Sequence, residues 1–482
     1  MKLLVKNNKI LKKDKSNLMF PSKDKSLINL LEIVGARYVF GEKINEFENF
    51  VSYDDFENVI STKELFSHCE NLQTIPLLNT SNVTDMSSMF SWCSNLQTIP
   101  QLDTSNVTDM YQMFYGCETL KTIPLLDTHN VTNMKYMFRF CENLQTIPLL
   151  DTSNVTDMES MFYSCYNLET IPLLNTSKVT DMSSMFYDCY KLQAIPLLDT
   201  SSVTDMGYMF DGCIILEAIP LLDTSKATNM NCMFSYCENL KTIPLLDTSN
   251  VTNMSHMFKN CENLQTIPQL DTSNVAYMSN MFQNCKNLKE IPLLNTSNVT
   301  TMEYMFQNCE NLQKIPLLDT SNVTEMGRMF EGCKNLQTIP QLDTSSNTDT
   351  GYMFSGCTNL QTIPQLDTSN VTYMYKMFQN CTNFQTIDLT SMDLITTSSF
   401  IAENCYSLTK FIVRNMTTIP PLNTNSFQNC YHFEGTVDST YNPEGLKDGR
   451  IYVPDNMVDT LKNATNWSAY ADIIVPLSTL EE

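Results

Sequence analysis

Hydrophobic side chains recur along most of this chain with a period of 24 residues. One repeat unit runs from Asn71 to Ser94, and its apolar positions are Leu72, Ile75, Leu78, Val83, Met86, Met89, Phe90 and Cys93. Cys returns at every step from Cys69 to Cys405 without a slip in register. A fixed period of this length is typical of a solenoid, in which each repeat buries its core against its neighbours.

The first part of the unit predicts a short strand. Leu72-x-Thr-Ile75 has two apolar positions, and Pro76 follows and recurs through Pro364. Proline has no amide hydrogen for a central strand to donate, so the strand should end there.

The second part of the unit predicts a short helical turn. Met89, Phe90 and Cys93 are spaced as on one inward face of a helix, and Phe holds its position without a break from Phe90 to Phe378. Side chains that do not vary in size over so many repeats should form stacked internal ladders. The unit therefore predicts an α/β solenoid, with one short strand and one short helical turn in each coil.

The Asp103-Thr-Ser-Asn106 segment and its copies predict turns. Asx and hydroxyl side chains in this pattern bond to nearby backbone groups. The Asp/Asn position (Asn79, Asp103, Asp127 and onward) could instead bind calcium between coils, but the Asn substitutions favour a hydrogen-bonded ladder. The position of Asn95 is interpreted in the same way, as a ladder that satisfies backbone groups.

The Cys positions allow two other readings, disulfides or a chain of metal sites. A uniform register on an inward-facing turn, with an odd count of fifteen, favours buried free thiols. The chain has only four His and no CxxC or HxxxH pattern, so no zinc site is predicted. No cofactor, metal or catalytic residue is predicted.

Composition and charge limit the possible partners. The 482 residues are 42% hydrophobic and 17% charged, with 30 Lys and Arg against 53 Asp and Glu and a net charge of −23. The chain can bury a core, and its acidity argues against nucleic acid as a partner. No apolar run reaches the length of about 20 residues that spans a membrane, and Lys residues interrupt the N-terminal segment. We therefore expect no membrane insertion and no classical export signal.

We call the equivalent positions of successive repeats a column. Columns whose residue type varies between repeats are candidates for ligand recognition. The column of Leu77 accepts Gln, as at Gln101, and should be half exposed. Exposed aromatic residues supply large contact area with few rotatable bonds. In the columns of residues 91 and 92, aromatic residues occur mainly in the first half of the chain. We predict that they bind the ligand, and they are Trp92, Tyr115, Phe140, Tyr163, Tyr187 and Tyr236. The alternative is that they are scattered, solvated surface residues.

The ends of the chain do not follow the repeat. We predict an N-terminal segment and cap at 1–47, the solenoid at 48–430 and a C-terminal cap at 431–482. Eight Lys in the first 25 residues form either a docking arm, toward other virion proteins, or a solvated tail. Within the C-terminal cap we expect a strand at 451–454, a helix at 455–464 and an amphipathic segment at 467–474.

The repeat resembles a known family. The SNVTDMSSMF…C unit that ends at Cys93 and recurs through Cys381 is similar to the repeat of BspA-like leucine-rich repeat surface proteins, first described in mycoplasma lipoproteins. The segment at 449–477 resembles the C-terminal cap of such proteins in gut bacteria and their phages. The resemblance implies a right-handed leucine-rich-repeat solenoid, capped at both ends, with an adhesive or host-recognition role and no catalytic residues.

These observations predict a non-enzymatic surface protein that binds a host or cell-surface glycan or protein. The sequence shows no signal peptide, lipobox or sorting tail, which favours a phage virion component such as a fibre or receptor-binding subunit. The alternatives are a bacterial cell-surface adhesin, a virion assembly scaffold and a glycan-cleaving tailspike. A tailspike needs two carboxylates about 5–10 Å apart, and the sequence sets no Asp pair apart from the others.

Overall fold

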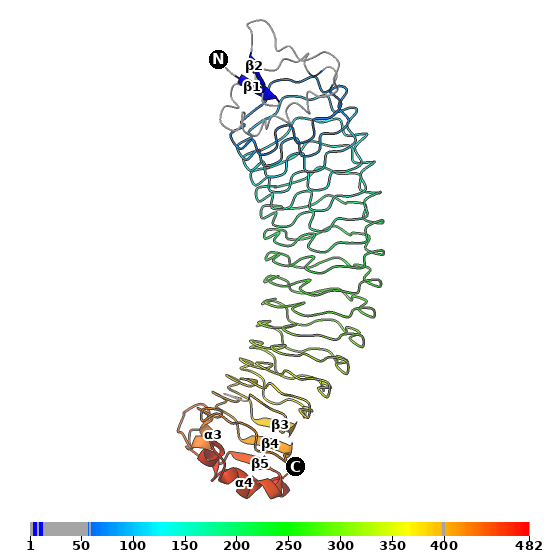
Figure 1. Cartoon of the computed structure of the whole chain (residues 1–482). Helices are drawn as coiled ribbons and strands as arrows, with labels where there is room; N and C mark the ends of the chain where they lie inside the picture. The colour runs from blue at the N-terminus through cyan, green and yellow to red at the C-terminus, as the bar shows by residue number, and fades with distance from the viewer. Residues whose placement is uncertain (1–2, 7–8, 13–55, 57–58, 398–400, 482) are drawn as a thin grey trace. The chain divides into compact units, whose positions relative to one another are not determined.

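A computed structural model describes residues 3–6, 9–12, 56, 59–397 and 401–481 (Figure 1). The described residues form two compact units, at 1–227 and 228–482, which are treated separately below. Strands β1 (Leu3–Lys6) and β2 (Lys9–Lys12) pair in antiparallel fashion. The remainder of the predicted N-terminal segment 1–47 lies outside the described residues, so the docking arm stays a prediction.

The repeats stack as coils (Figure 1), and ladders of identical side chains run inside each unit, as predicted. Phe rings stack from Phe66 to Phe210 in the first unit and from Phe234 to Phe378 in the second, with neighbouring centroids 5.6 or 5.7 Å apart. Phe90 is fully buried. Burial contributes roughly 1.5–3 kcal/mol for each such side chain, before entropy is subtracted. The ladders therefore form the core of each unit.

The predicted helical turn is wrong. The Met89 amide donates to Met86 O (3.2 Å) and the Cys93 amide to Phe90 O (3.0 Å), which closes four-residue turns, while the Phe90 amide crosses to Met113 O in the next coil (2.9 Å). Trp92, the third residue of its turn, has a φ of 60°, as type II turns require a positive φ at that place. A helix would use all these amides within one coil, whereas here they alternate between the coil and its neighbour.

The predicted strand at the Leu72–Ile75 position is also wrong for most coils. Described residues 59–385 contain no strand, and most parallel bridges there run through another column, as between Asp85 and Asp109. In the predicted strand column only the last of these coils forms a bridge, from Thr362 to Thr386. Within the described repeats, strands appear only where the proline column ends. Asp388 occupies this column in β3 (Thr386–Ser391) and Ile412 occupies it in β4 (Lys410–Asn415). The prolines of the earlier coils lack the amide hydrogen that a continuous ladder needs.

The C-terminal elements extend the sheet of the last coils. Strands β3, β4, β5 (Arg450–Val453) and β6 (Ile474–Pro476) form one parallel sheet in that order. Between and after them lie α3 (Tyr431–Glu434), η3 (Asp455–Met457), α4 (Val458–Lys462), η4 (Trp467–Tyr470) and η5 (Leu477–Thr479). The predicted strand at 451–454 is confirmed, and the predicted helix at 455–464 is a 3₁₀ turn followed by α4. The segment at 467–474 is η4 and the start of β6.

Trp467 anchors this C-terminal region. Its ring is fully buried, and Nε1 donates to Pro420 O at 3.0 Å. The sheet continues across residue 430 through the pairing of β4 with β5. The domain boundaries drawn from the sequence remain predictions.

The Cys ladder is buried, as predicted. All seventeen Cys are buried and none forms a disulfide. The Cys93 thiol donates to Phe66 O at 3.0 Å, and its equivalents repeat this bond. Burial raises the pKa of the Cys117 thiol well above its usual value and that of Cys381 to about 12. These thiols are therefore protonated at neutral pH, and they act as small apolar core residues.

Candidate ligand-binding surfaces

Five of the six predicted aromatic residues lie together in the first unit. Ring centroids are 5.2 Å apart for Trp92 and Tyr115, 5.5 Å for Tyr115 and Phe140, 5.5 Å for Phe140 and Tyr163, and 4.3 Å for Tyr163 and Tyr187. We call these five residues the aromatic ridge. Trp92 is 36% exposed and the other four are half-buried, so the rings support one another and still reach the surface.

The backbone under the ridge favours other residues. Trp92 and Phe140 have φ values of 60° and 61°, in the left-handed region that bulky side chains avoid. Later coils place Asn or Gly at this column, as at Asn284 and Gly332, and these residues adopt a positive φ with less strain. Folding alone therefore does not call for aromatic residues at this column.

Gly116 makes room for the Trp92 indole. A Cβ at Gly116 would lie only 2.6 Å from Trp92 Cε3, and Gly116 itself has a φ of 72°. Because this coil presents no side chain here, Trp92 reaches Phe140 two coils away and stacks on it at 6.1 Å.

Arg139 lies inside the ridge. Its guanidinium carbon is 3.9 Å from the Tyr163 ring centroid and 5.1 Å from that of Phe140, which is the geometry of a cation–π contact. The buried Nε of Arg139 has no hydrogen-bond partner among the described residues. Burial raises the pKa of the Tyr163 and Tyr187 phenols, so both hydroxyls are protonated at neutral pH and can donate hydrogen bonds.

A small polar pocket borders the ridge at Trp92 and Tyr115. Its volume is about 260 Å³, and the other lining residues are Glu64, Ser67, His68, Ser88, Ser91 and Gln112. The His68 ring lies 6.5 Å from Trp92, nearly parallel to the indole. The pocket thus combines one aromatic wall with several hydrogen-bonding groups.

The sixth predicted residue, Tyr236, belongs to the second unit and is described there. It is 45% exposed. The second unit instead has a tyrosine cluster that the sequence analysis did not single out. There the Arg328 guanidinium lies 3.8 Å from the Tyr352 ring centroid and 5.7 Å from that of Tyr304. In the sequence, this cluster is indicated by Tyr residues that recur in the column of Ser88.

The column of Leu77 is more exposed than predicted, and it borders a groove in the first unit. Leu125, Leu149 and Leu173 are 61–63% exposed. With Leu77 they line a groove of about 1080 Å³, and Asp103, Asp127 and Asp151 belong to the same lining. We call these seven residues and the space between them the leucine groove.

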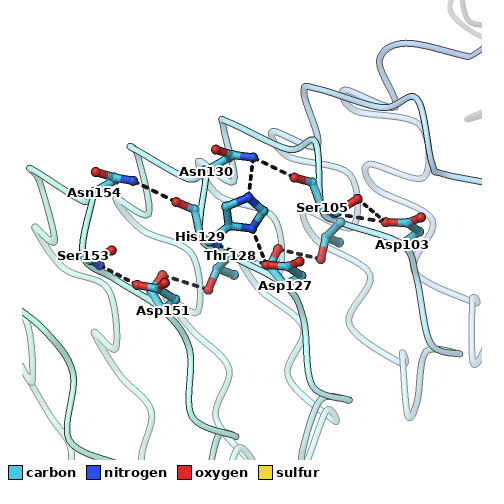
Figure 2. Close-up of polar contacts among 10 residues, drawn as sticks. Asp103, Ser105, Asp127, Thr128, His129, Asn130, Asp151, Ser153 and Asn154 are labelled. Atoms are coloured by element: carbon cyan, nitrogen blue, oxygen red, sulfur yellow. Dashed lines mark hydrogen bonds and ion pairs between the residues drawn. The ribbon is translucent and has the colours of Figure 1, made fainter.

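The Asp residues of the groove form a hydrogen-bonded ladder of turns, as predicted (Figure 2). Ser105 donates to Asp103 Oδ1 through its amide (3.1 Å) and its hydroxyl (2.7 Å), and the Ser153 amide donates to Asp151 Oδ1 at 2.9 Å. In the coil between, His129 replaces Ser, and its Nδ1 lies 2.6 Å from Asp127 Oδ1. These hydrogen bonds hold the pKa of Asp127 and Asp151 below its usual range, so both are ionised at neutral pH.

The Asn95 column is also a ladder, as predicted. Asn95 Nδ2 donates to Glu70 O at 2.8 Å, and Asn143 Nδ2 donates to Glu118 O at the same distance. In the second unit the amides bond to one another instead, for example Asn311 Nδ2 to Asn287 Oδ1. In both arrangements the Asn side-chain amides bond to the neighbouring coil and hold the coils together.

The described residues contain no cluster of three or more His, Cys, Asp or Glu arranged to hold a metal ion. No helix in the described part of the chain is long and apolar enough to cross a membrane. The groove carboxylates all lie in equivalent turns, so their geometry sets no pair apart for acid–base chemistry.

The stacked 24-residue coils define the chain as a solenoid repeat protein. A family described as "Mycoplasma protein of unknown function, DUF285" matches it at 36–146, 118–219, 166–263, 213–317 and 310–417. The chain therefore belongs to this family, which confirms the resemblance to BspA-like repeat proteins. No curated protein matches the chain.

Several solved structures are similar to this chain. A leucine-rich cell surface protein from Faecalibacterium prausnitzii is 24% identical, with 62% of this chain and 81% of that protein covered and a TM-score of 0.37. A leucine-rich repeat protein from Bacteroides ovatus is 19% identical, with 69% and 82% covered and a TM-score of 0.39. One from Eubacterium ventriosum is 19% identical, with 61% and 79% covered and a TM-score of 0.36.

Proposed function

We propose that this protein is a non-enzymatic recognition protein that binds a carbohydrate polymer of a cell surface through the aromatic ridge. The observation that carries the proposal is the placement of Trp92 and Phe140 at positive φ. The coils from Asn260 onward place Gly or Asn at this column and keep the same core. Strained residues that the fold does not require point to a function for the side chains themselves.

The surroundings of the ridge favour a glycan over a protein. The adjoining pocket offers the carboxylate of Glu64, the imidazole of His68 and the amide of Gln112 beside the Trp92 ring. Such a mixture of hydrogen-bonding groups and one aromatic wall suits a sugar ring, which has hydroxyls at its edge and C–H groups on its faces. The ridge spans five coils, and this length suits a polymer better than a single sugar.

A surface location follows from this proposal, on a bacterial cell or on a virion. Immunogold labelling of whole cells and of virions with an antibody to this chain would separate the two locations.

Removing three rings of the ridge tests the function. A Trp92→Ala, Tyr163→Ala, Tyr187→Ala variant should bind at least about tenfold more weakly to a printed array of bacterial and host glycans and to intact cells. An anchor residue can contribute about 2 kcal/mol, and about 1.4 kcal/mol corresponds to tenfold in affinity. Because the rings are half-buried and stacked, each aromatic pair also contributes about 0.5–1.5 kcal/mol to stability, so melting curves must accompany the assay.

The matched control changes the column of Tyr163 and Tyr187 in the second unit, where Gln283, Gln307 and Gln379 are replaced by Ala. It should bind normally. If the ridge variant is folded and binds normally while the control loses binding, the contact surface lies elsewhere. Binding to a purified cell-surface protein but to no glycan would overturn the choice of ligand.

A further inference from the structure

The leucine groove is a second exposed feature that the fold does not require. In the first unit the column of Leu77 holds leucine in five consecutive coils, at Leu125, Leu149, Leu173, Leu197 and Leu221, each 61–63% exposed. In the second unit Gln269 and Gln341 interrupt the same column. Runs of exposed apolar side chains in a soluble protein mark interaction sites.

Glutamine shows that this column does not need leucine for folding. Gln101 Nε2 donates to Leu125 O in the next coil at 2.6 Å, and Gln269 Nε2 donates to Leu293 O at the same distance. A Gln here is therefore exposed, satisfied and bonded to its neighbour. Leucine in five successive coils exposes apolar surface without making this bond, so we look for its role outside the chain.

We propose that the leucine groove binds an extended polypeptide segment of a partner protein that carries both aliphatic and basic side chains. The leucines would contact the aliphatic side chains, and Asp103, Asp127 and Asp151 would attract the basic ones. The groove shares no residue with the aromatic ridge or its polar pocket, so this proposal is independent of glycan binding.

The charges of the groove favour a cationic ligand. Its lining includes three Asp and no Lys or Arg, and His129 is the single residue there that can become cationic. Each serine turn uses Oδ1 of its Asp, as in Ser105 with Asp103. The side chain of Asp127, whose hydrogen-bond partner is His129, is 53% exposed. An anionic nucleic acid or acidic polysaccharide would be repelled by this surface.

The chemistry of the groove also favours a peptide over a sugar. Its apolar side is aliphatic, whereas the ridge offers aromatic rings. The Gln101 bond shows that the Leu125 carbonyl accepts an amide donor. The backbone amides of an extended segment could donate in the same way to the equivalent carbonyls of other coils. A polypeptide also combines amides, aliphatic groups and cations in one chain.

The test uses the full chain and fluorescein-labelled twelve-residue peptides, measured by fluorescence anisotropy. The first peptide repeats Lys-Leu-Thr-Leu three times, the second has Glu in place of each Lys, and the third has Ser in place of each Leu. We expect saturable binding of the first peptide, weakened by salt, and binding at least about tenfold weaker for the other two.

Protein variants copy residues that the chain itself uses at these columns, which protects the fold. The leucine variant takes its glutamines from the example of Gln101 and combines Leu125→Gln, Leu149→Gln and Leu173→Gln. The aspartate variant takes its asparagines from Asn79 and Asn175, which make the same turn, and combines Asp103→Asn, Asp127→Asn and Asp151→Asn. Each triple variant should bind the first peptide at least about tenfold more weakly. A control with Gln97, Gln145 and Gln193 changed to Ser, at exposed positions outside the groove, should bind as the wild type does.

Unchanged affinity in the leucine variant would overturn the proposal, since binding would then be electrostatic alone. Equal affinity for the Lys and Glu peptides would overturn it as well. If a glycan of the array competes with the peptide, the groove takes a carbohydrate and the assignment to a polypeptide is wrong. Normal glycan binding by the leucine variant would show that the two surfaces act separately.

Discussion

Replacing Asn347 with Val should stabilise the second unit. Asn347 occupies the column held by Val323 and Val371 in the neighbouring coils, and its side chain is fully buried. Neither Oδ1 nor Nδ2 of its amide has a hydrogen-bond partner among the described residues. Asn347→Val therefore removes two unsatisfied polar atoms and restores the apolar ladder.

The expected gain follows from the cost of burying a polar group. A buried donor or acceptor without a partner costs about 1–3 kcal/mol, and valine fits this column in the neighbouring coils, at Val323 and Val371. We expect the free energy of unfolding to rise by about 1–3 kcal/mol. The reverse substitution, Val323→Asn, should lower it by a similar amount or more, because it adds a second polar defect beside the first.

Urea unfolding followed by circular dichroism measures the change, and hydrogen exchange locates it. In a repeat protein each coil contacts only its neighbours, so the effect should centre on nearby amides such as that of Phe354, which donates to Met377 O at 2.9 Å. Exchange there should slow in Asn347→Val. A loss of stability, or no change, would refute the reasoning, because it would mean that the amide is satisfied in solution.

Four further predictions address the core, the ridge and the groove. The Cys thiols should be inert to a thiol reagent in the native state at pH 8 and should all react after unfolding, because burial raises their pKa; several disulfides between coils in a mass spectrum would contradict this. Deleting one whole repeat, 165–188, should leave a folded protein with a cooperative melt, whereas deleting 12 residues should not. Gly116→Ala should destabilise the first unit and change the Trp92 fluorescence, because the new Cβ meets both the indole and a positive φ; an unchanged spectrum would count against the described ridge. Because hydrogen bonds lower the pKa of Asp151, peptide binding by a His129→Ser variant, which removes the one groove residue that can become cationic, should stay constant from pH 8 to about 5 and fall only as the pH drops below about 3.9, the usual Asp value; a loss already complete at pH 6 would argue against these carboxylates.

The core could be predicted from the sequence because the same columns are apolar in every repeat. The backbone path could not, because a spacing of three and four suits both a helix and a series of turns with positive φ. The choice between them was available from Asn284 and Gly332, whose residue types favour the left-handed region. Pro76 predicts the end of a strand, but proline in the same column of neighbouring coils prevents the strand ladder itself in these coils.

The ridge could be predicted in part, and the groove could not. Trp92, Tyr115 and Phe140 fall in adjacent columns, so the period alone brings them together. The contribution of Gly116 depends on the direction of the Trp92 ring, which no pattern gives. The leucine groove depends on the exposure of Leu125 and its equivalents, and the sequence indicated only that their column accepts Gln.

Quenching of tryptophan fluorescence tests the central claim most directly. The chain has two Trp: Trp467 is fully buried and Trp92 is 36% exposed, so acrylamide quenching of the native protein reports mainly on Trp92. A saturating amount of the polysaccharide that binds most strongly on the array should shield Trp92 and lower the quenching constant severalfold. An unchanged quenching constant at saturation would show that the ligand does not contact the aromatic ridge, and it would contradict the proposed function.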